Sequence, residues 1–342
     1  MRLLALLALL VLAACSRPVP EGVTELTYAS PYPPSHPFSR ADQTWIDFVH
    51  ERSGGHMKIK PIWSGALLSA DMSMTEIRHG VADIGLITPI YTRGGTHLLR
   101  TQTGFYSGAD SIESQLALYR CMANVEPQFD KELEGLKLLA LQGGVLPGIL
   151  TSTARVESLE DLQGLRIRAP TELLPVLRNL GADPVDLPMG EVYSALAKGV
   201  IDGVVAPPET LQSLHFGEVT DYFYDIRIPR GAYPSRAMDM EAWQTLSDGE
   251  RAILEESIAV WEAALAEENR AAAAAGEKIA ASTITILPAS AQDQQQFDDL
   301  YLREGQANAR ALSRVGIDGM TAYRAARQSL VERDTVQCGD TK

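Results

Sequence analysis

Residues 199–208 read GVIDGVVAPP, and residues 80–89 read GVADIGLITP. Each stretch has a Gly-Val pair, one intervening residue, an aspartate, and then an apolar run that ends at proline. The pattern predicts a helix that ends at the glycine, a tight turn in which the aspartate accepts backbone N–H bonds, and a buried strand. Such helix-turn-strand units are common, so chance similarity is the alternative. The repeat favours a duplicated α/β domain.

The segments around both copies alternate between strand and helix patterns. Short apolar or alternating runs predict strands, and longer stretches with apolar residues at helical spacing predict helices. Strands that alternate with helices form parallel sheets covered by helices, and such sheets bind ligands beyond the carboxyl ends of their strands. The expected strands are 26–30, 57–63, 84–87, 136–141, 165–168, 184–187 and 200–205, and the expected helices are 39–52, 71–79, 172–180 and 191–198.

The C-terminal third is dominated by one long helical pattern. Ser247 and Glu250 form a capping box, and the residues from there to about Ala281 are nearly all good helix formers. A helix of about 34 residues is about 50 Å long, which is enough to run along two domains. Further strands are expected at 222–228, 237–240 and 284–287, and further helices at 290–315 and 319–332.

Composition narrows the class of protein. A chain of 342 residues suits two domains, and the net charge of −14 gives no sign of the basic face that nucleic-acid binding requires. The sequence contains no Gly-x-Ser-x-Gly elbow, no Walker-type phosphate loop and no His-Glu-x-x-His pair. Its six histidines show no metal-ligand spacing. We therefore expect no enzyme, no cofactor, no metal and no nucleic-acid partner.

The N-terminus, 1–22, has the pattern of a signal peptide with a lipobox and a tether. Arg2 precedes the short apolar run 3–12, and residues 12–15 read LAAC. Cleavage before Cys15 would leave a lipidated cysteine, and the alternative is a plain secretory signal cut nearby. We expect a periplasmic, membrane-anchored lipoprotein of a Gram-negative bacterium.

Two further cysteines remain after Cys15. Cys121 lies in a helical pattern and Cys338 lies near the C-terminus. An exported protein can pair them, which would pin the C-terminal tail, or they can stay free thiols.

Residues 157–209 read ESLEDLQGLRIRAPTELLPVLRNLGADPVDLPMGEVYSALAKGVIDGVVAPPE. This series of motifs resembles the solute-binding proteins of tripartite ATP-independent periplasmic (TRAP) transporters, the DctP-like family. Residues 54–89 resemble the first domain of the same family, and the resemblance covers nearly all of 24–330. It implies an α/β, two-lobed periplasmic-binding-protein fold of type II-like form, in which each lobe is a sheet flanked by helices, with hinge strands and a long bridging helix. The expected division is 23–145 plus 232–270 for lobe I, 146–231 plus 271–332 for lobe II, and 333–342 for a C-terminal tail.

The resemblance also implies a carboxylate ligand held mainly by one arginine, which corresponds to Arg168. A planar guanidinium can hold a carboxylate through two parallel charge-assisted bonds. Arg166 lies on the same side of the alternating strand and is a second candidate, and a surface ion pair is the alternative for either. The further ligand-binding candidates are Met189, Ala206, Pro207 and Glu209 in the second lobe, Tyr32, His36, Trp63 and Thr88 in the first, and Tyr233 where the chain crosses between lobes.

Two departures from relatives that bind sialic acid narrow the expected ligand. Those relatives carry an asparagine where this chain has Ala206, and a second arginine whose place falls at Gly148. Both departures argue against a polyhydroxylated sugar acid and favour a smaller or more apolar acid.

The resemblance implies an extracytoplasmic protein that captures an organic acid between its lobes and delivers it to a TRAP membrane permease. A receptor that reports ligand occupancy to a signalling protein is one alternative, and a periplasmic enzyme on the same scaffold is another. Because the C-terminal tail is short, we expect a monomer.

Overall fold

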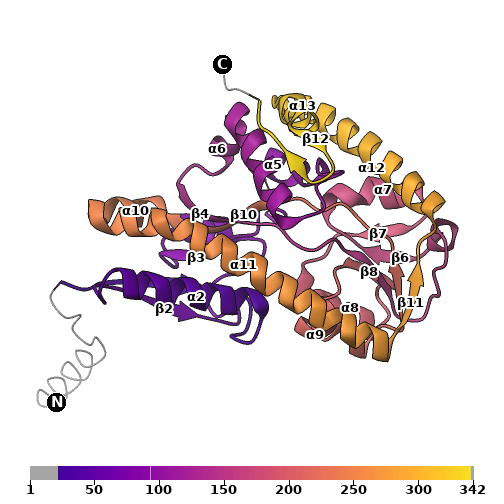
Figure 1. Ribbon diagram of the computed structural model, residues 1–342, viewed down its shortest axis with the longest axis horizontal. Helices are drawn as coiled ribbons and strands as arrows, with labels where there is room; N and C mark the ends of the chain where they lie inside the picture. The colour runs from indigo at the N-terminus through magenta and orange to yellow at the C-terminus, as the bar shows by residue number, and fades with distance from the viewer. Residues whose placement is uncertain (1–21, 93, 340–342) are drawn as a thin grey trace, which may run out of the picture.

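The computed structural model describes residues 22–92 and 94–339. It contains two mixed sheets flanked by helices, which confirms the expected α/β fold (Figure 1). The first sheet has the order β2-β1-β3-β10-β4, and the second has the order β11-β9-β5-β8-β6-β7. The strands of the first sheet are β1 Thr24–Ala29, β2 Met57–Ile62, β3 Ile84–Leu86, β4 Leu136–Gln142 and β10 Tyr233–Asp239. Those of the second are β5 Gly148–Thr151, β6 Arg166–Arg168, β7 Asp183–Val185, β8 Gly203–Ala206, β9 Tyr222–Asp225 and β11 Thr285–Pro288.

Each sheet contains one strand that runs against both of its neighbours, so the expectation of parallel sheets was wrong in part. In the first sheet this strand is β10, and in the second it is β5. Both strands begin where the chain has just crossed from the other sheet, after the short links 143–147 and 226–232. Neither strand follows a helix of its own sheet, so neither completes the strand-helix-strand unit that makes neighbours parallel. The strand pattern at 148–151 was not recognised from the sequence.

The repeated sequence device has the same structure in both sheets. The glycine that follows each helix has a positive φ, 66° in the first copy and 64° in the second. Asp83 Oδ2 accepts the N–H of Thr27 at 2.7 Å, and Asp202 Oδ2 accepts the N–H of Arg166 at 2.8 Å. Each aspartate thereby ties its turn to the neighbouring parallel strand, β1 in one sheet and β6 in the other.

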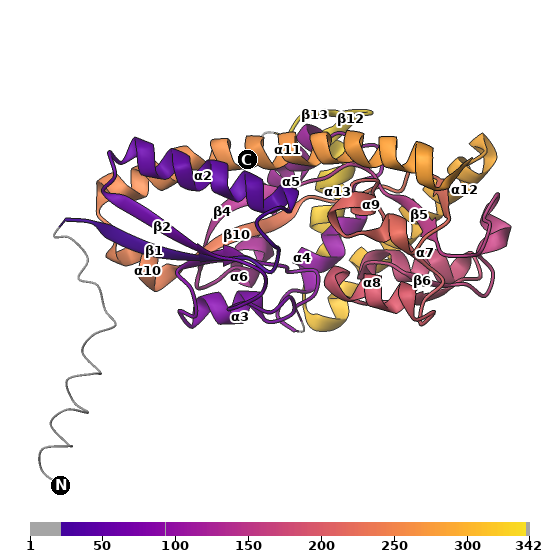
Figure 2. The same ribbon diagram turned by 90° about the horizontal axis from the view of Figure 1, so that it is seen from below.

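The long helix α11, Asp248–Thr283, begins at the expected capping box and runs along both sheets (Figure 2). Its first half packs against α2, Pro37–Arg52, where the rings of Trp45 and Trp261 stack with centroids 3.7 Å apart. The other helices include α3 Ser73–Arg78, α4 His97–Thr101, α5 Ile112–Val125, α7 Leu174–Asn179, α8 Met189–Ala197, α9 Thr210–Ser213, α10 Met240–Thr245, α12 Ala291–Ala311 and α13 Gly319–Ser329, with short 3-10 turns η1 Gln102–Gly104 and η3 Thr171–Leu173.

A buried polar network joins α11 to the first sheet. The carboxylate of Asp42 on α2 accepts from Arg236 Nε on β10 and from Trp261 Nε1 on α11, both at 2.9 Å. The hydroxyl of Tyr28 on β1 donates to the same carboxylate. All four side chains are fully buried. Removal of one partner of a buried ion pair leaves the other charge buried and unpaired, which is strongly destabilising. This network therefore fixes the bridging helix to the first lobe.

The chain from α13 on packs on the first lobe, whereas α12 contributes to the core of the second. Helix α13 packs in the core that contains α5, whereas the expected division assigned 271–332 to the second lobe. Beyond α13, a hairpin of β12 Leu330–Glu332 and β13 Thr335–Val336 leads to Cys338, which is joined to Cys121 by a disulfide.

Two results concern the membrane. The expected signal peptide, lipobox and Cys15 fall in residues 1–21, outside the described residues. Among the helices of the described chain, none is long and apolar enough to cross a bilayer.

Candidate ligand-binding site

A cavity lies between the two sheets, at the carboxyl ends of their parallel strands. It encloses about 120 Å³. The first lobe lines it with the loops that follow β1 and β3, and the second lobe with the residues that follow β6, β7 and β8. The crossing segments supply Pro147, Pro229, Arg230 and Gly231, and Tyr233 lines the cavity from the start of β10. Open α/β sheets bind ligands at this edge, so the fold brings the two carboxyl ends together where the sequence predicted a cleft.

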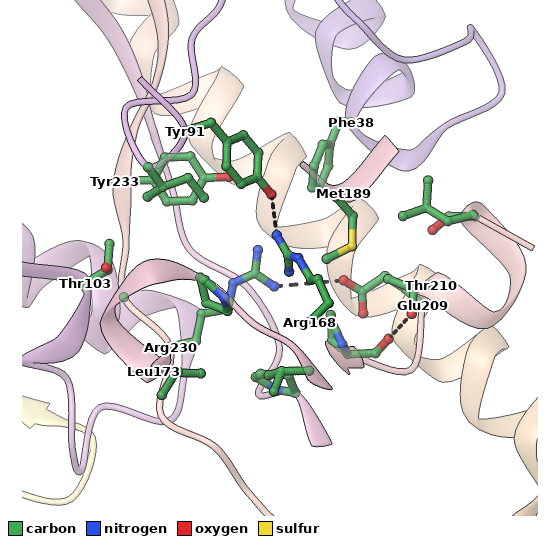
Figure 3. A pocket seen from close by; sticks show the side chains of 18 of the residues that line it. Phe38, Tyr91, Thr103, Arg168, Leu173, Met189, Glu209, Thr210, Arg230 and Tyr233 are labelled. Atoms are coloured by element: carbon green, nitrogen blue, oxygen red, sulfur yellow. Dashed lines mark hydrogen bonds and ion pairs between the residues drawn. The ribbon is translucent and has the colours of Figure 1, made fainter. Parts of the chain in front are cut away.

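Arg168 stands at the end of β6 and lines the cavity (Figure 3). Only 2% of the residue is exposed. Its Nε donates to the carbonyl of Leu187 at 2.7 Å, and its Nη2 donates to the hydroxyl of Tyr91 at 2.8 Å. Within the described chain, no carboxylate lies within ion-pair distance of this guanidinium, and Nη1 has no hydrogen bond. A buried cation held by neutral acceptors retains donors for an anion.

Arg166 does not line the cavity. Its Nε and Nη2 donate to the carboxylate of Asp202 at 2.9 and 2.6 Å, and its side chain is partly exposed. The alternating strand does place Arg166 and Arg168 on one side. Two residues along a strand are about 7 Å apart, however, and Arg166 stands at the end of β6 away from the cavity. The surface ion pair, which was the alternative, describes this residue.

A cluster of aromatic side chains, Tyr32, His36 and Phe38, lines the first-lobe side of the cavity. The ring of His36 stacks on Tyr32 with centroids 4.0 Å apart, and its Nδ1 accepts the N–H of Phe38 as the N-cap of α2. Burial, with the nearby charges of Arg236 and Arg40, lowers the pKa of His36 to about 3. His36 therefore lines the cavity as a neutral ring. Tyr233 from β10 lines the same cavity.

Arg230, which sequence reasoning missed, brings a second guanidinium to the cavity. It lies between Pro229 and Gly231 in the crossing segment before β10. Its Nη1 is 4.0 Å from Oε1 of Glu209, which is buried (Figure 3). The guanidinium packs on the backbone of Gly144, where an added Cβ would lie 2.4 Å from Cζ. The signal in the sequence was an arginine in the segment that also carries Tyr233, where the chain crosses between lobes.

Two carboxyl groups in the cavity wall have raised pKa values. Burial raises the pKa of Glu209 to about 7, and the charge of Arg230 opposes the rise. Burial also raises the pKa of Glu172 to about 7, and the charge of Arg168 is among the effects that oppose it. Glu172 follows β6 and was not among the expected residues.

Three other expected residues lie outside the cavity, whereas Met189 and Pro207 line it. Ala206 is fully buried in the core beneath α8, because the alternation of β8 turns Val205 to the cavity instead. Trp63 packs edge-on against Tyr28, with ring centroids 5.7 Å apart. The hydroxyl of Thr88 forms hydrogen bonds with the hydroxyl of Ser73, 3.3 Å away, and with the carbonyl of Ala70.

Comparison with known families identifies the chain's class. The model of bacterial extracellular solute-binding protein family 7, DctP, matches residues 28–303. The chain belongs to this family. The expected resemblance to the DctP-like solute-binding proteins of TRAP transporters is therefore confirmed.

The curated relatives of this chain are distant. The uncharacterized protein YiiZ of Salmonella typhimurium is 28% identical over 61% of this chain and 64% of its own length. A solute-binding protein of Chromohalobacter salexigens is 24% identical over 72% of this chain and 76% of its own length. The 2,3-diketo-L-gulonate-binding periplasmic protein YiaO of Escherichia coli is 25% identical over 53% of this chain and 56% of its own length. The matched region thus spans less than two thirds of the Salmonella and E. coli proteins.

Solved structures of TRAP solute-binding proteins share the fold of this DctP chain. One from Rhodoferax ferrireducens, in complex with copurified benzoate, has a TM-score of 0.80 at 24% identity over 90% of this chain and 97% of its own. Another from Bordetella bronchiseptica, with bound mandelate, has a TM-score of 0.76 at 21% identity over 89% of this chain and 98% of its own. At these identities the likeness concerns the fold.

Proposed function

We propose that this protein captures a small organic acid in the cavity between its lobes and delivers it to the membrane permease of a TRAP transporter. The observation that carries the proposal is Arg168, a buried guanidinium in the cavity wall that is held by neutral acceptors. A ligand carboxylate would supply the missing counter-charge through charge-assisted bonds. Closure of the lobes removes water and strengthens this pair, because the effective dielectric constant falls.

The cavity wall favours an acid with a small, largely apolar body. The cavity volume of about 120 Å³ is below the roughly 300–1,000 Å³ that is typical of sites for drug-sized ligands. The side chains that line the cavity with Arg168 are mostly apolar or aromatic. Benzoate and mandelate, bound by two proteins of the same fold, have this size and character. The apolar and aromatic lining includes Phe38, Ile90, Leu173, Met189, Val205 and Leu214.

The proposal also includes the location of the protein and the motion of its lobes. The protein works outside the cytoplasm as a monomer, anchored through a lipid on Cys15, and needs no cofactor. The lobes open and close about the crossing segments 143–147 and 226–232, with α11 as the bridge. Ligand binding favours the closed form only to the extent that it contacts the closed form better than the open one.

A thermal-shift screen of small carboxylates tests the proposal, with the carboxamide of each acid as its matched control. A ligand at 100 times its Kd stabilises the folded protein by about 2.7 kcal/mol. We expect at least one acid to raise the Tm while its amide does not, since the amide lacks the charge that Arg168 requires. If no carboxylate raises the Tm, or if acids and amides act equally, the proposal is wrong.

A further inference from the structure

The two cations in the cavity wall have different surroundings. Arg168 faces the cavity with neutral hydrogen-bond partners, whereas Arg230 has Glu209 at 4.0 Å (Figure 3). Arg168 therefore presents a cation without a carboxylate partner. Arg230 presents a cation with a carboxyl group beside it.

Glu209 has an unused hydrogen-bonding atom. Its Oε2 is buried and has no hydrogen-bond partner among the described residues, while Oε1 faces Arg230. A buried polar atom without a partner carries a desolvation cost. A group that donates a hydrogen bond to this carboxyl would remove that cost, and Arg230 beside it offers donors of its own.

We propose that the ligand is a monocarboxylate that also carries an uncharged hydroxyl or amide group, with its carboxylate on Arg168 and its uncharged group between Arg230 and Glu209. The inference rests on the proposed function and specifies the substrate class of the same site. A hydroxyl or amide can accept a hydrogen bond from Arg230 and donate one to Glu209 at once. A second carboxylate can only accept, so it cannot satisfy both residues while Glu209 is ionised.

Electrostatics disfavours a dicarboxylate for the same reason. Two like charges a few ångström apart in a partly buried site repel each other strongly. A second ligand carboxylate on Arg230 would meet the charge of Glu209 in this way. Glu172 adds a further carboxyl group to the wall, and the neutral ring of His36 adds no cation. Removal of the charge of Glu209 leaves Arg230 uncompensated, and the preference should then change toward dianions.

Calorimetry on matched acids tests the inference. Phenylacetate, mandelate and phenylmalonate carry hydrogen, hydroxyl and carboxylate on the same carbon, and propanoate, lactate and methylmalonate form the same series on a methyl frame. Near pH 8, where Glu209 is mostly ionised, we expect the wild type to bind the hydroxy acid at least about tenfold more tightly than the parent acid or the diacid of its series. In Glu209→Gln, the affinity for the diacid relative to the parent acid should rise about tenfold or more.

Two further variants identify the source of that change. Adding Arg230→Met to Glu209→Gln should abolish the gain for the diacid, because the uncompensated cation is gone. Glu191→Gln removes an exposed acid outside the cavity and should leave the ratios of the wild type.

The outcomes separate this inference from the proposed function. A wild type that binds the diacid as tightly as the hydroxy acid overturns the inference, whatever the variants do. So does a Glu209→Gln protein that binds the parent acid but keeps the wild-type ratio, and so does a wild type that binds carboxylates in the screen but none of these six. A wild type that binds no carboxylate at all overturns the proposed function instead.

Discussion

Glu209 is a buried carboxyl group, and at the scale of single residues its burial makes stability depend on pH. Burial raises the pKa of Glu209 from an ordinary 4.5 to about 7, although Arg230 opposes the rise. A carboxyl whose pKa is higher in the folded protein contributes stability that is fully present below the unfolded pKa. That contribution is lost as the pH rises through the folded pKa, here between about 4.5 and 7. Ordinary exposed carboxylates give no such loss in this range.

Glu209→Gln should therefore flatten the pH dependence of stability. We expect the ligand-free wild type to lose free energy of unfolding between about pH 5 and pH 8, relative to the variant, because the variant has no charge to bury. Urea unfolding at both pH values measures the difference, and Glu191→Gln serves as the exposed control. An equal stability difference between wild type and Glu209→Gln at both pH values would contradict the assigned burial cost.

Helix α11 shapes the cavity although its side chains do not line it. At Gly276 the helix backbone meets the loop that follows β8, and an added Cβ would lie 2.0 Å from the carbonyl oxygen of Pro208 and 2.9 Å from the N of Glu209. Both neighbours are backbone atoms, which cannot turn aside as a side chain can. The loop carries Pro207 and Glu209 into the cavity, so the approach of the helix sets their positions.

Gly276→Ala should weaken ligand binding without touching the ligand. Overpacking of this kind costs about 1–3 kcal/mol, and here part of the strain must displace the Pro207–Glu209 loop. We expect calorimetry to show about tenfold weaker binding of the tightest acid from the screen. Gly249→Ala is the matched control, since a Cβ there meets nothing within 4 Å in the same helix. Equal affinities for the two variants would show that the loop adapts freely.

Elements with a local signal were predictable from the sequence. The repeated Gly-Val-x-Asp device and the capping box at Ser247 specify their own turns through short-range hydrogen bonds, and the structure contains both. Arg168 was named through the family motif. Strand β5 and Arg230 were missed because a crossing segment has no periodicity, and its partners come from distant parts of the chain. Arg166 was misplaced because alternation gives the side of a strand and not the position along it.

At the scale of the whole molecule, the disulfide between Cys121 and Cys338 holds the C-terminal tail on the first lobe. Cys121 lies on α5, and 217 residues separate it from Cys338. A second contact holds the same tail. The carboxylate of Asp334, in the terminal hairpin, accepts hydrogen bonds from the N–H groups of Asp110 and Ser111 just before α5. The tail thus packs on the first lobe, outside the residues that line the cavity.

Replacing both cysteines, Cys121→Ser with Cys338→Ser, should lower the free energy of unfolding by about 2–4 kcal/mol, because the unfolded chain is no longer constrained. The Kd for the tightest acid should stay the same, since neither cysteine lines the cavity. Urea unfolding and calorimetry measure the two quantities, and the wild type in reductant should behave like the variant. A large loss of affinity would instead link the tail to the closure of the lobes.

The account as a whole depends on a carboxylate that binds Arg168 between the lobes. Calorimetry of the tightest acid on Arg168→Ala tests this most directly, with Arg166→Ala as the control on the same strand. We expect Arg168→Ala to lose about 3–5 kcal/mol of binding free energy, because a buried charge is left unpaired. Arg166→Ala should bind like the wild type, since Arg166 pairs with Asp202 outside the cavity. Folded Arg168→Ala protein that binds the acid with wild-type affinity would contradict the account.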